Sequence, residues 1–197
     1  MNKPTASRRD ASSMRRAAFR EPPVKRPNYF SGKMLSADDF TAEQEYHRGK
    51  RRLHNLHCHG FGVVQGLKVL TVKENSGWTV VIEPGFAIDS TGNEIQLCTT
   101  IRFRLPKSQT AIQVGIRFSE RLCDPVPSLS DATSLGPQPS RVEEGCEVIL
   151  KPLPMRRSPR ARTGGLGASA DFLPLAHLVR RGSVWKVSQK RIVPRAR

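Results

Sequence analysis

The sequence lacks the features that would place the chain in a membrane or a secretory pathway. No apolar stretch approaches the ~18 to 20 residues that span a bilayer, and residues 1–20 have no apolar centre like that of a secretory signal. Aromatic residues make up only 6% of the 197 residues and hydrophobic residues 37%. We therefore expect one domain, or one domain plus tails, with a hydrophobic core of modest size. The length of the chain excludes a TIM barrel or a two-domain cofactor enzyme of ordinary size.

Metal-binding spacings are also missing. The four cysteines form neither a C-x-x-C pair nor a zinc module, so we expect reduced, buried thiols. His54 and Cys58 lie one helical turn apart, beside His57 and His59, which is a spacing that metal ligands can use. No second cluster completes a set of four ligands, and histidines are electrostatically favoured at a helix C-terminus. We therefore expect no metal and no cofactor.

Catalytic signatures are missing as well. Residues 165–170 match G-x-G-x-x-A, but SPRART precedes them and DFLPL follows. A dinucleotide-binding fingerprint needs a strand before it and a helix after it. The sequence has no phosphate-binding P-loop, no H-E-x-x-H and no nucleophile elbow. Since no set of nucleophile, base and oxyanion donors assembles, we expect that the chain is not an enzyme.

Positive charge is abundant and unevenly placed. The formal net charge of the chain is +16. The summed charge of three segments is larger than this, so the rest of the chain is near neutral; the segments are residues 1–26, 151–162 and 180–197. These segments are rich in Pro, Ser and Gly and poor in the aromatics that stack on nucleic acid. Three interpretations of their arginine clusters stay open: solvated tails that touch acidic neighbours or nothing, nonspecific contact with nucleic acid, or arms that order against a protein partner. The clusters are Arg8 with Arg9, Arg15 with Arg16, and Arg156 with Arg157.

One long helix is predicted over residues 37–58. Ser36 and Asp39 form a carboxylate version of a capping box, and Gly60 provides a stop. Apolar and polar residues recur at heptad spacing along one face, which suits packing against another helix. This face, called the seam below, contains Phe40, Gln44, His47, Arg51 and His54. Because the seam is polar, we expect a wet subunit interface. Phe40 itself is expected to be a core residue, whose truncation to Ala would cost about 3 to 5 kcal/mol.

The rest of the sequence changes to short apolar segments at regular spacing with turn residues between them, which predicts strands. The fold class is therefore mainly β: an N-terminal arm and one long α-helix, followed by an antiparallel β-sandwich or barrel. The predicted organisation is a flexible basic arm at 1–27, an entry segment and helix at 28–60, a β domain at 61–194 and a tail at 195–197. Long loops are expected within the β domain at 124–141 and 154–170.

Two strings carry a family resemblance. Residues 28–67, NYFSGKMLSADDFTAEQEYHRGKRRLHNLHCHGFGVVQGL, and residues 84–95, PGFAIDSTGNEI, resemble structural proteins of contractile phage tails and of bacterial phage-tail-like contractile injection systems. The C-terminal LPLAHLV and WKV are similar to a strand that closes the domain in such proteins. A fainter likeness links the first segment to the type VI secretion baseplate subunit that carries a receptor-binding-protein shoulder.

The resemblance implies a non-catalytic assembly subunit. Its place would be near the baseplate, the fibre attachment or the cap, in a virion or in an injection particle assembled in the cytoplasm. Its partners would be other tail or baseplate subunits and copies of itself around a symmetry axis. Two alternatives remain. The basic tails could bind nucleic acid, or Trp78 and Trp185 could form a sugar-binding platform, although both lie in apolar strands typical of a core.

Overall fold

The computed structural model describes residues 25–75, 77–127, 136–153, 172–189 and 196. The chain divides into two compact units, residues 1–50 and 51–197, and each is described by itself. Most of the expected arm, the loop at 154–170 and the arginines at positions 8, 9, 15, 16, 156 and 157 lie outside the described residues. Among the described residues, no helix is both long and apolar enough to cross a bilayer.

The helix expected over 37–58 is present as α1 (Ala37–His54), continued by the short π-helix η1 (Asn55–His59). Gly60 follows as the stop, and its N–H donates to the carbonyl of Leu56 at 3.2 Å. Ten strands follow in the described part of the chain. They are β1 (Gly62–Gly66), β2 (Val69–Glu74), β3 (Gly77–Ile82), β4 (Gly85–Ile88), β5 (Glu94–Leu97), β6 (Ile101–Arg104), β7 (Ala111–Val126), β8 (Gln138–Pro152), β9 (Leu173–Arg181) and β10 (Val184–Ser188).

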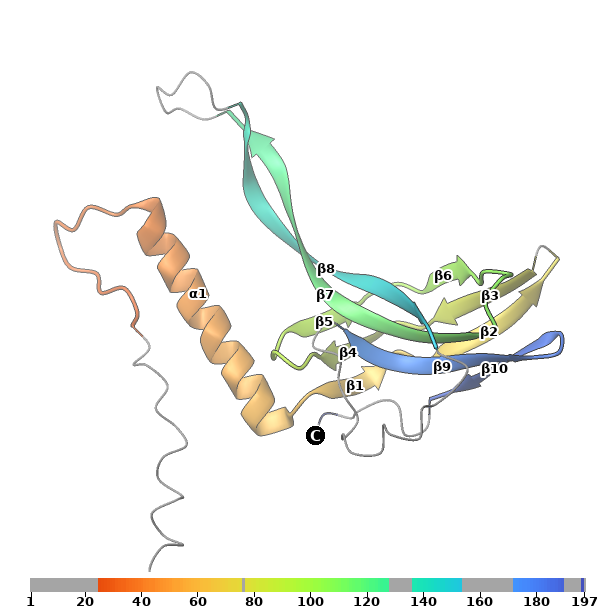
Figure 1. Ribbon diagram of the computed structural model, residues 1–197. Coiled ribbons are helices and arrows are strands. Elements are labelled where there is room, and N and C mark those ends of the chain that lie inside the picture. Colours follow the sequence, from red (N-terminus) through yellow and green to blue (C-terminus); the bar gives the residue numbers. More distant parts are fainter. Residues whose placement is uncertain (1–24, 76, 128–135, 154–171, 190–195, 197) are drawn as a thin grey trace, which may run out of the picture. The chain divides into compact units, whose positions relative to one another are not determined.

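The strands form three antiparallel sheets, which confirms the predicted fold class. Their orders are β1-β4-β5, β2-β3-β6 and β10-β9-β7-β8, and every pairing among them is antiparallel. Consecutive strands pair as hairpins in β2–β3 and in β9–β10 (Figure 1). The four-stranded sheet carries the longest strands, because β7 pairs with β8 along nearly its whole length.

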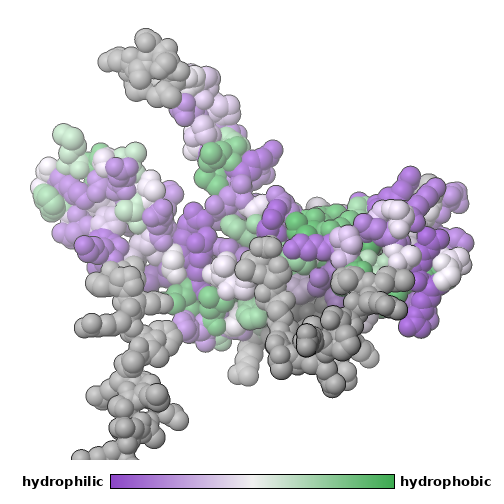
Figure 2. All heavy atoms as spheres, in the orientation of Figure 1, coloured by the Kyte–Doolittle hydropathy of each residue, from purple (hydrophilic) through white to green (hydrophobic). Residues whose placement is uncertain are grey.

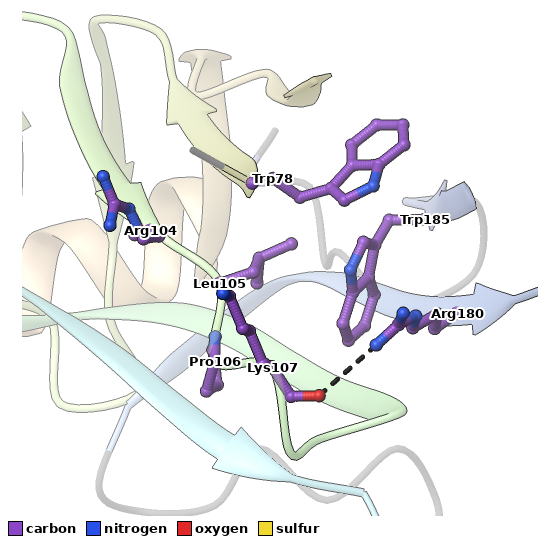
Figure 3. A pocket seen from close by; sticks show the side chains of 8 residues that line it. Trp78, Arg104, Leu105, Pro106, Lys107, Arg180 and Trp185 are labelled. Carbon is purple, nitrogen blue, oxygen red and sulfur yellow. Dashed lines mark hydrogen bonds between the residues drawn. The ribbon is translucent and has the colours of Figure 1, made fainter. Parts of the chain in front are cut away.

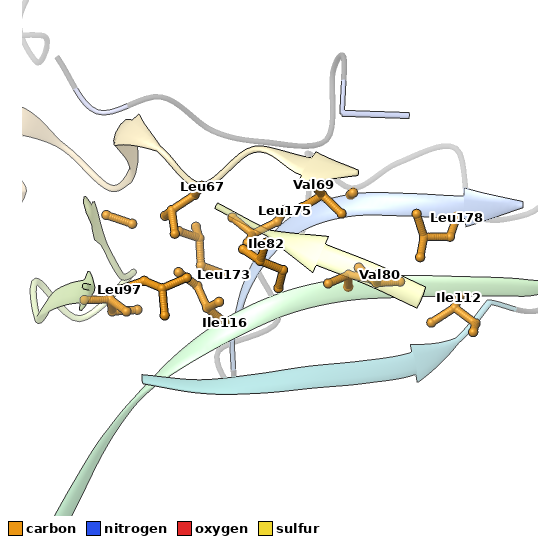
Figure 4. Packing of buried hydrophobic residues seen from close by; sticks show 14 of the residues in the cluster. Leu67, Val69, Val80, Ile82, Leu97, Ile112, Ile116, Leu173, Leu175 and Leu178 are labelled. Atoms are coloured by element: carbon orange, nitrogen blue, oxygen red, sulfur yellow. The ribbon is translucent and has the colours of Figure 1, made fainter. Parts of the chain in front are cut away.

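The hydrophobic core draws on all three sheets (Figure 4). On β7, Ile112, Val114 and Ile116 are fully buried, since alternate residues of a strand point to the same face. They pack with residues of the two three-stranded sheets, such as Val80 and Ile95. This interdigitation between facing sheets is that of a β-sandwich.

Two glycines allow the backbone to pass very closely at one corner of the β body. Gly66 at the end of β1 pairs with Gly85 at the start of β4. Gly66 has φ +64°, and a Cβ added there would lie 2.2 Å from the carbonyl oxygen of Pro84. A side chain at this position would therefore meet backbone that cannot swing aside.

The loop expected at 124–141 is shorter than predicted. Strand β7 continues to Val126 and β8 begins at Gln138, with Pro125 opposite Pro139. The prolines and serines of this stretch suggested a loop. Proline is tolerated in an edge strand, however, at positions where the N–H that it lacks would not point toward a neighbouring strand. Strand β9 pairs with β7 only from Ala111 to Ile116. Beyond that point β7 and β8 form a two-stranded ribbon (Figure 1).

The expectation of buried thiols is wrong, because none of the four cysteines is fully buried. All four are free, but Cys58 and Cys98 are exposed, whereas Cys123 and Cys146 are half-buried. Cys58 lies in η1 and Cys98 just after β5, at positions that the core does not cover. Burial, followed by the charge of Glu147, raises the pKa of Cys146 to about 11.

Gly66→Ala tests the close approach at the corner of the β body. We expect the substitution to lower the free energy of unfolding by about 2 to 4 kcal/mol, from overpacking added to left-handed backbone strain. Gly182→Ala is the matched control, because Gly182 has nearly the same positive φ (+62°) but no atom within 4 Å of an added Cβ. Urea unfolding of both variants measures the difference, and equal losses would contradict the clash at Gly66.

Candidate assembly surfaces

The start of helix α1 is fixed by a reciprocal cap, which confirms the predicted capping box. The backbone N–H of Ser36 donates to Asp39 Oδ2 at 3.1 Å, and the N–H of Asp39 donates to Ser36 Oγ at 3.3 Å. Lys33 Nζ lies 2.8 Å from Asp39 Oδ1. The Lys33 bond, followed by those from Ser36, lowers the pKa of Asp39 from 3.8 to about 2.

The entry segment is tied to the helix through its aromatic residue. The Tyr29 hydroxyl donates a hydrogen bond to the Glu43 carboxylate, and the Lys33 ammonium lies 5.3 Å from the centre of the Tyr29 ring. The bond from Tyr29 is the main cause of a lowered pKa for Glu43. Residues 29–39 therefore have a defined path although little of this segment is buried.

Large apolar side chains of this segment remain in solvent. Met34 is 91% exposed and Phe40 is 55% exposed, and no residue of α1 is buried. The expectation that Phe40 belongs to the core is therefore wrong. Heptad spacing reports which residues share a face, and it cannot report whether the same chain covers that face. Figure 2 shows hydrophobic residues at the surface of this segment, and Tyr29, Phe30 and Leu35 belong to the same exposed set.

The other seam residues are exposed as well. Gln44, His47, Arg51 and His54 have solvent-accessible side chains. His47 Nε2 lies 3.5 Å from Glu43 Oε1, and His54 Nδ1 lies 3.5 Å from Cys58 Sγ. The described residues contain no group of three or more His, Cys, Asp or Glu side chains that could hold a metal ion. The role of the seam as a subunit interface stays a prediction.

Residues after Lys50 are bound to the turn between β4 and β5. Asn55 is only 6% exposed, and its Nδ2 donates to the Gly92 carbonyl at 3.0 Å and to Glu94 Oε1 at 3.1 Å. Arg52 Nε donates to Asn93 Oδ1 at 2.6 Å. We call this group of bonds the latch. The hydrogen bonds of the latch were not predicted from the sequence. Arg52 and Asn55 lie in one family-like string, and the residues that accept their bonds lie in the other: Gly92, Asn93 and Glu94.

The turn that receives the latch is rigid in its own right. Asp89 Oδ1 accepts hydrogen bonds from the N–H groups of Thr91 at 2.8 Å and Asn93 at 2.9 Å. Gly92 lies in this turn with φ +87°. A Cβ on Gly92 would lie 2.4 Å from the carbonyl oxygen of Arg52, so the latch also requires glycine at this position.

Arg51 contributes weaker contacts to the same region. Its guanidinium lies 3.9 Å from Glu94 and 4.0 Å from Glu144. Exposed ion pairs at such distances contribute little to stability. Arg51 therefore remains available at the surface as a seam residue.

A second exposed surface is the ribbon formed by residues 117–126 and 138–147. Leu122 is 66% exposed and stands opposite Val142, which is also exposed. Arg117 pairs with Glu147, and Arg121 pairs with Glu143. An isolated two-stranded ribbon is marginally stable in water, and these cross-strand ion pairs support it. Figure 2 shows hydrophobic residues at its surface.

Comparisons with known proteins identify a shared fold. No protein-family model matches the sequence, and no curated protein matches it. Among solved structures, a chain of the type VI secretion TssK-TssF-TssG baseplate subcomplex is similar at 13% identity with a TM-score of 0.50, covering 87% of this chain and 62% of that chain. A crystal structure of TssK (11% identity, TM-score 0.47, covering 84% of this chain and 41% of that chain) and a chain of the type VI secretion baseplate complex (13%, 0.47, 87% and 60%) are also similar. The chain thus spans 62% of the length of the first of these.

Asn55→Ala tests the latch. Because the amide is buried and makes two hydrogen bonds, we expect a loss of about 1 to 3 kcal/mol in the free energy of unfolding. Arg51→Gln is the control and should cost no more than about 0.5 kcal/mol, since its ion pairs are exposed. Thermal and urea unfolding measure both variants. Equally small losses in the free energy of unfolding for both variants would contradict a stabilising role of the latch.

Asp39 provides a pH test of the helix start. Its pKa is lower in the folded chain than in an unfolded one, so it stabilises the helix start above about pH 4 and loses this effect as the pH falls through about 2. In a carbon-detected NMR titration, Lys33→Gln should raise the Asp39 midpoint, whereas Lys50→Gln at the opposite end of the helix should leave it in place. A wild-type midpoint near 3.8 would refute the assigned cap.

Proposed function

We propose that the chain is a non-catalytic structural subunit of a contractile injection particle, in or next to its baseplate. The observation that carries the proposal is a helix of 18 residues without a buried residue, followed along the chain by strands, in a chain whose fold is shared with a type VI secretion baseplate chain. The family-like strings at 28–67 and 84–95 support the same assignment. The particle would be a phage virion or an injection particle assembled in the cytoplasm.

Helix α1 supports this role because its seam is exposed to solvent. A helix of this length is marginal in water by itself, and helices in proteins gain most of their stability from packing. Its caps fix where it begins and ends, but its seam offers Phe40 with Gln44 and His47 to solvent. A partner helix would bury Phe40 and keep the polar seam residues hydrogen-bonded. Symmetry copies of this chain are the partners that the heptad spacing favours.

The ribbon would provide a second contact with a neighbouring subunit. Leu122 and Val142 are exposed and stand opposite each other on one face of the ribbon. The ion pair of Arg121 with Glu143 is at the adjacent register position and therefore points to the other face. An apolar pair on one face would give a neighbouring subunit a small hydrophobic contact. The basic segments at 1–26 and 151–162 would add arginine contacts to acidic grooves of other subunits.

Particle incorporation tests this proposal. We expect that Phe40→Ala, and separately deletion of residues 1–26, leave the β body folded but prevent the tagged chain from co-sedimenting with contractile particles. Phe40→Ala should change the free energy of unfolding by less than about 1 kcal/mol, because the side chain is exposed. Val184→Ala, at another exposed apolar position, is the matched control and should be incorporated normally.

Normal incorporation of both altered chains would contradict the proposed contacts. Absence of the unaltered chain from particles, together with DNA binding that falls steeply with salt, would favour the nucleic-acid alternative. Circular dichroism of each variant distinguishes a lost contact from a lost fold.

A further inference from the structure

The β body has a cavity that the assembly surfaces do not use. Its volume is about 340 Å³, and it lies where the ends of β3 and β6 meet β9 and β10. Both tryptophans of the chain, Trp78 and Trp185, contribute to its lining. Figure 3 shows the Trp185 ring beside the Arg180 guanidinium, with Leu105 and Pro106 across from them. A volume near 300 Å³ is at the small end of ligand pockets.

The aromatic part of the cavity is held in place. Trp185 is 4% exposed and belongs to the core. Trp78 packs against the core, and its indole N–H donates to the carbonyl of Ser183 at 2.9 Å. The backbone N–H of Leu105 donates to the Trp78 carbonyl at 2.8 Å. The cavity is therefore preformed, so a ligand would not need to order these walls.

The charged side chains that line the cavity are all basic. Arg104, Lys107 and Arg180 line it, and no acidic residue is among the described residues of the lining. Arg180 Nε donates to the Gly182 carbonyl at 3.1 Å, and Nη1 donates to the Lys107 carbonyl at 3.3 Å. Both acceptors are neutral, so they orient the guanidinium without cancelling its charge. Arginine has five N–H donors, which leaves donors for an anion.

We propose that this cavity binds an acidic peptide segment of a partner protein, with a Glu or Asp carboxylate held by Arg180 and Lys107. Arginine binds carboxylates through strong, charge-assisted hydrogen bonds, and Trp78 offers apolar surface to the adjoining residue. A sugar platform fits less well, because stacking needs an open indole face and that of Trp185 is buried. The inference goes beyond the proposed function, since binding is measured on the full chain without any particle.

Tryptophan fluorescence is a direct test, because the only two tryptophans of the chain line the cavity. The probe is an end-capped hexaglutamate peptide at ~150 mM salt, which screens distant charges. We expect a saturable change in emission. Hexalysine, oligoglucuronate and inorganic phosphate are the comparison probes and should give no saturable change. The basic residues at 190–197 follow Trp185 closely in sequence, so a chain that ends at Gln189 is a further control. It should bind hexaglutamate with unchanged affinity, and loss of the response in it would assign binding to the basic tail.

Variants separate this site from general attraction to a basic chain. Arg180→Gln should weaken hexaglutamate binding by ~10-fold or more, as expected for loss of a charged anchor. Lys107→Gln should weaken it several-fold and serves as a second variant, because its backbone carbonyl still positions Arg180. Lys186→Gln is the matched control: it removes the same charge from an exposed position next to Trp185 and should leave affinity unchanged.

Three further results would overturn the proposal. One is no saturable response to hexaglutamate. Another is an equal loss of affinity in Lys186→Gln and in the folded Arg180 and Lys107 variants, which would show general charge attraction. The third is a response to oligoglucuronate or phosphate in place of the peptide, which would reassign the cavity to an acidic sugar or a phosphate group. Particle incorporation of Phe40→Ala is independent of all three, so failure here leaves the proposed function to its own test.

Discussion

The buried amide of Asn55 is the interaction on which the arrangement of residues 51–97 depends. At the junction of α1 and η1, this amide donates to a carbonyl and a carboxylate of the β4–β5 turn. That turn is itself closed by Asp89. The latch therefore joins η1, which precedes the first strand, to a hairpin some forty residues later. Without it, the Gly92 carbonyl and the Glu94 carboxylate would lose the amide donor that ties their turn to η1.

Local features were predictable from the sequence, because their physics is local. The capping box and the glycine stop at Gly60 each depend on residues a few positions apart. The alternation of apolar residues likewise indicated antiparallel strands and a core. The shared β fold could be expected for the same reason.

Features that depend on distant neighbours were not predictable in this way. Phe40 has core-like spacing, yet no spacing reports whether a face is covered. The prolines at 125 and 139 suggested a loop, and only pairing with the opposite strand shows that they belong to a ribbon. The latch was hidden for the same reason: both strings that carry the family resemblance contain its residues, but the sequence does not show that they meet. The cavity combines β3, β6, β9 and β10, which lie far apart along the chain.

The groups that stabilise the fold are different from the surfaces that we propose for binding partners. The sandwich core and the latch satisfy their own apolar and polar atoms, and the described residues contain no buried side-chain polar atom without a partner. The seam and the ribbon expose apolar area, and Arg180 in the cationic cavity donates to two neutral carbonyls. A partner that binds these surfaces stabilises the folded chain by mass action. Assembly would then complete the stability of the helix and the ribbon, which the free chain supports only through caps and cross-strand pairs.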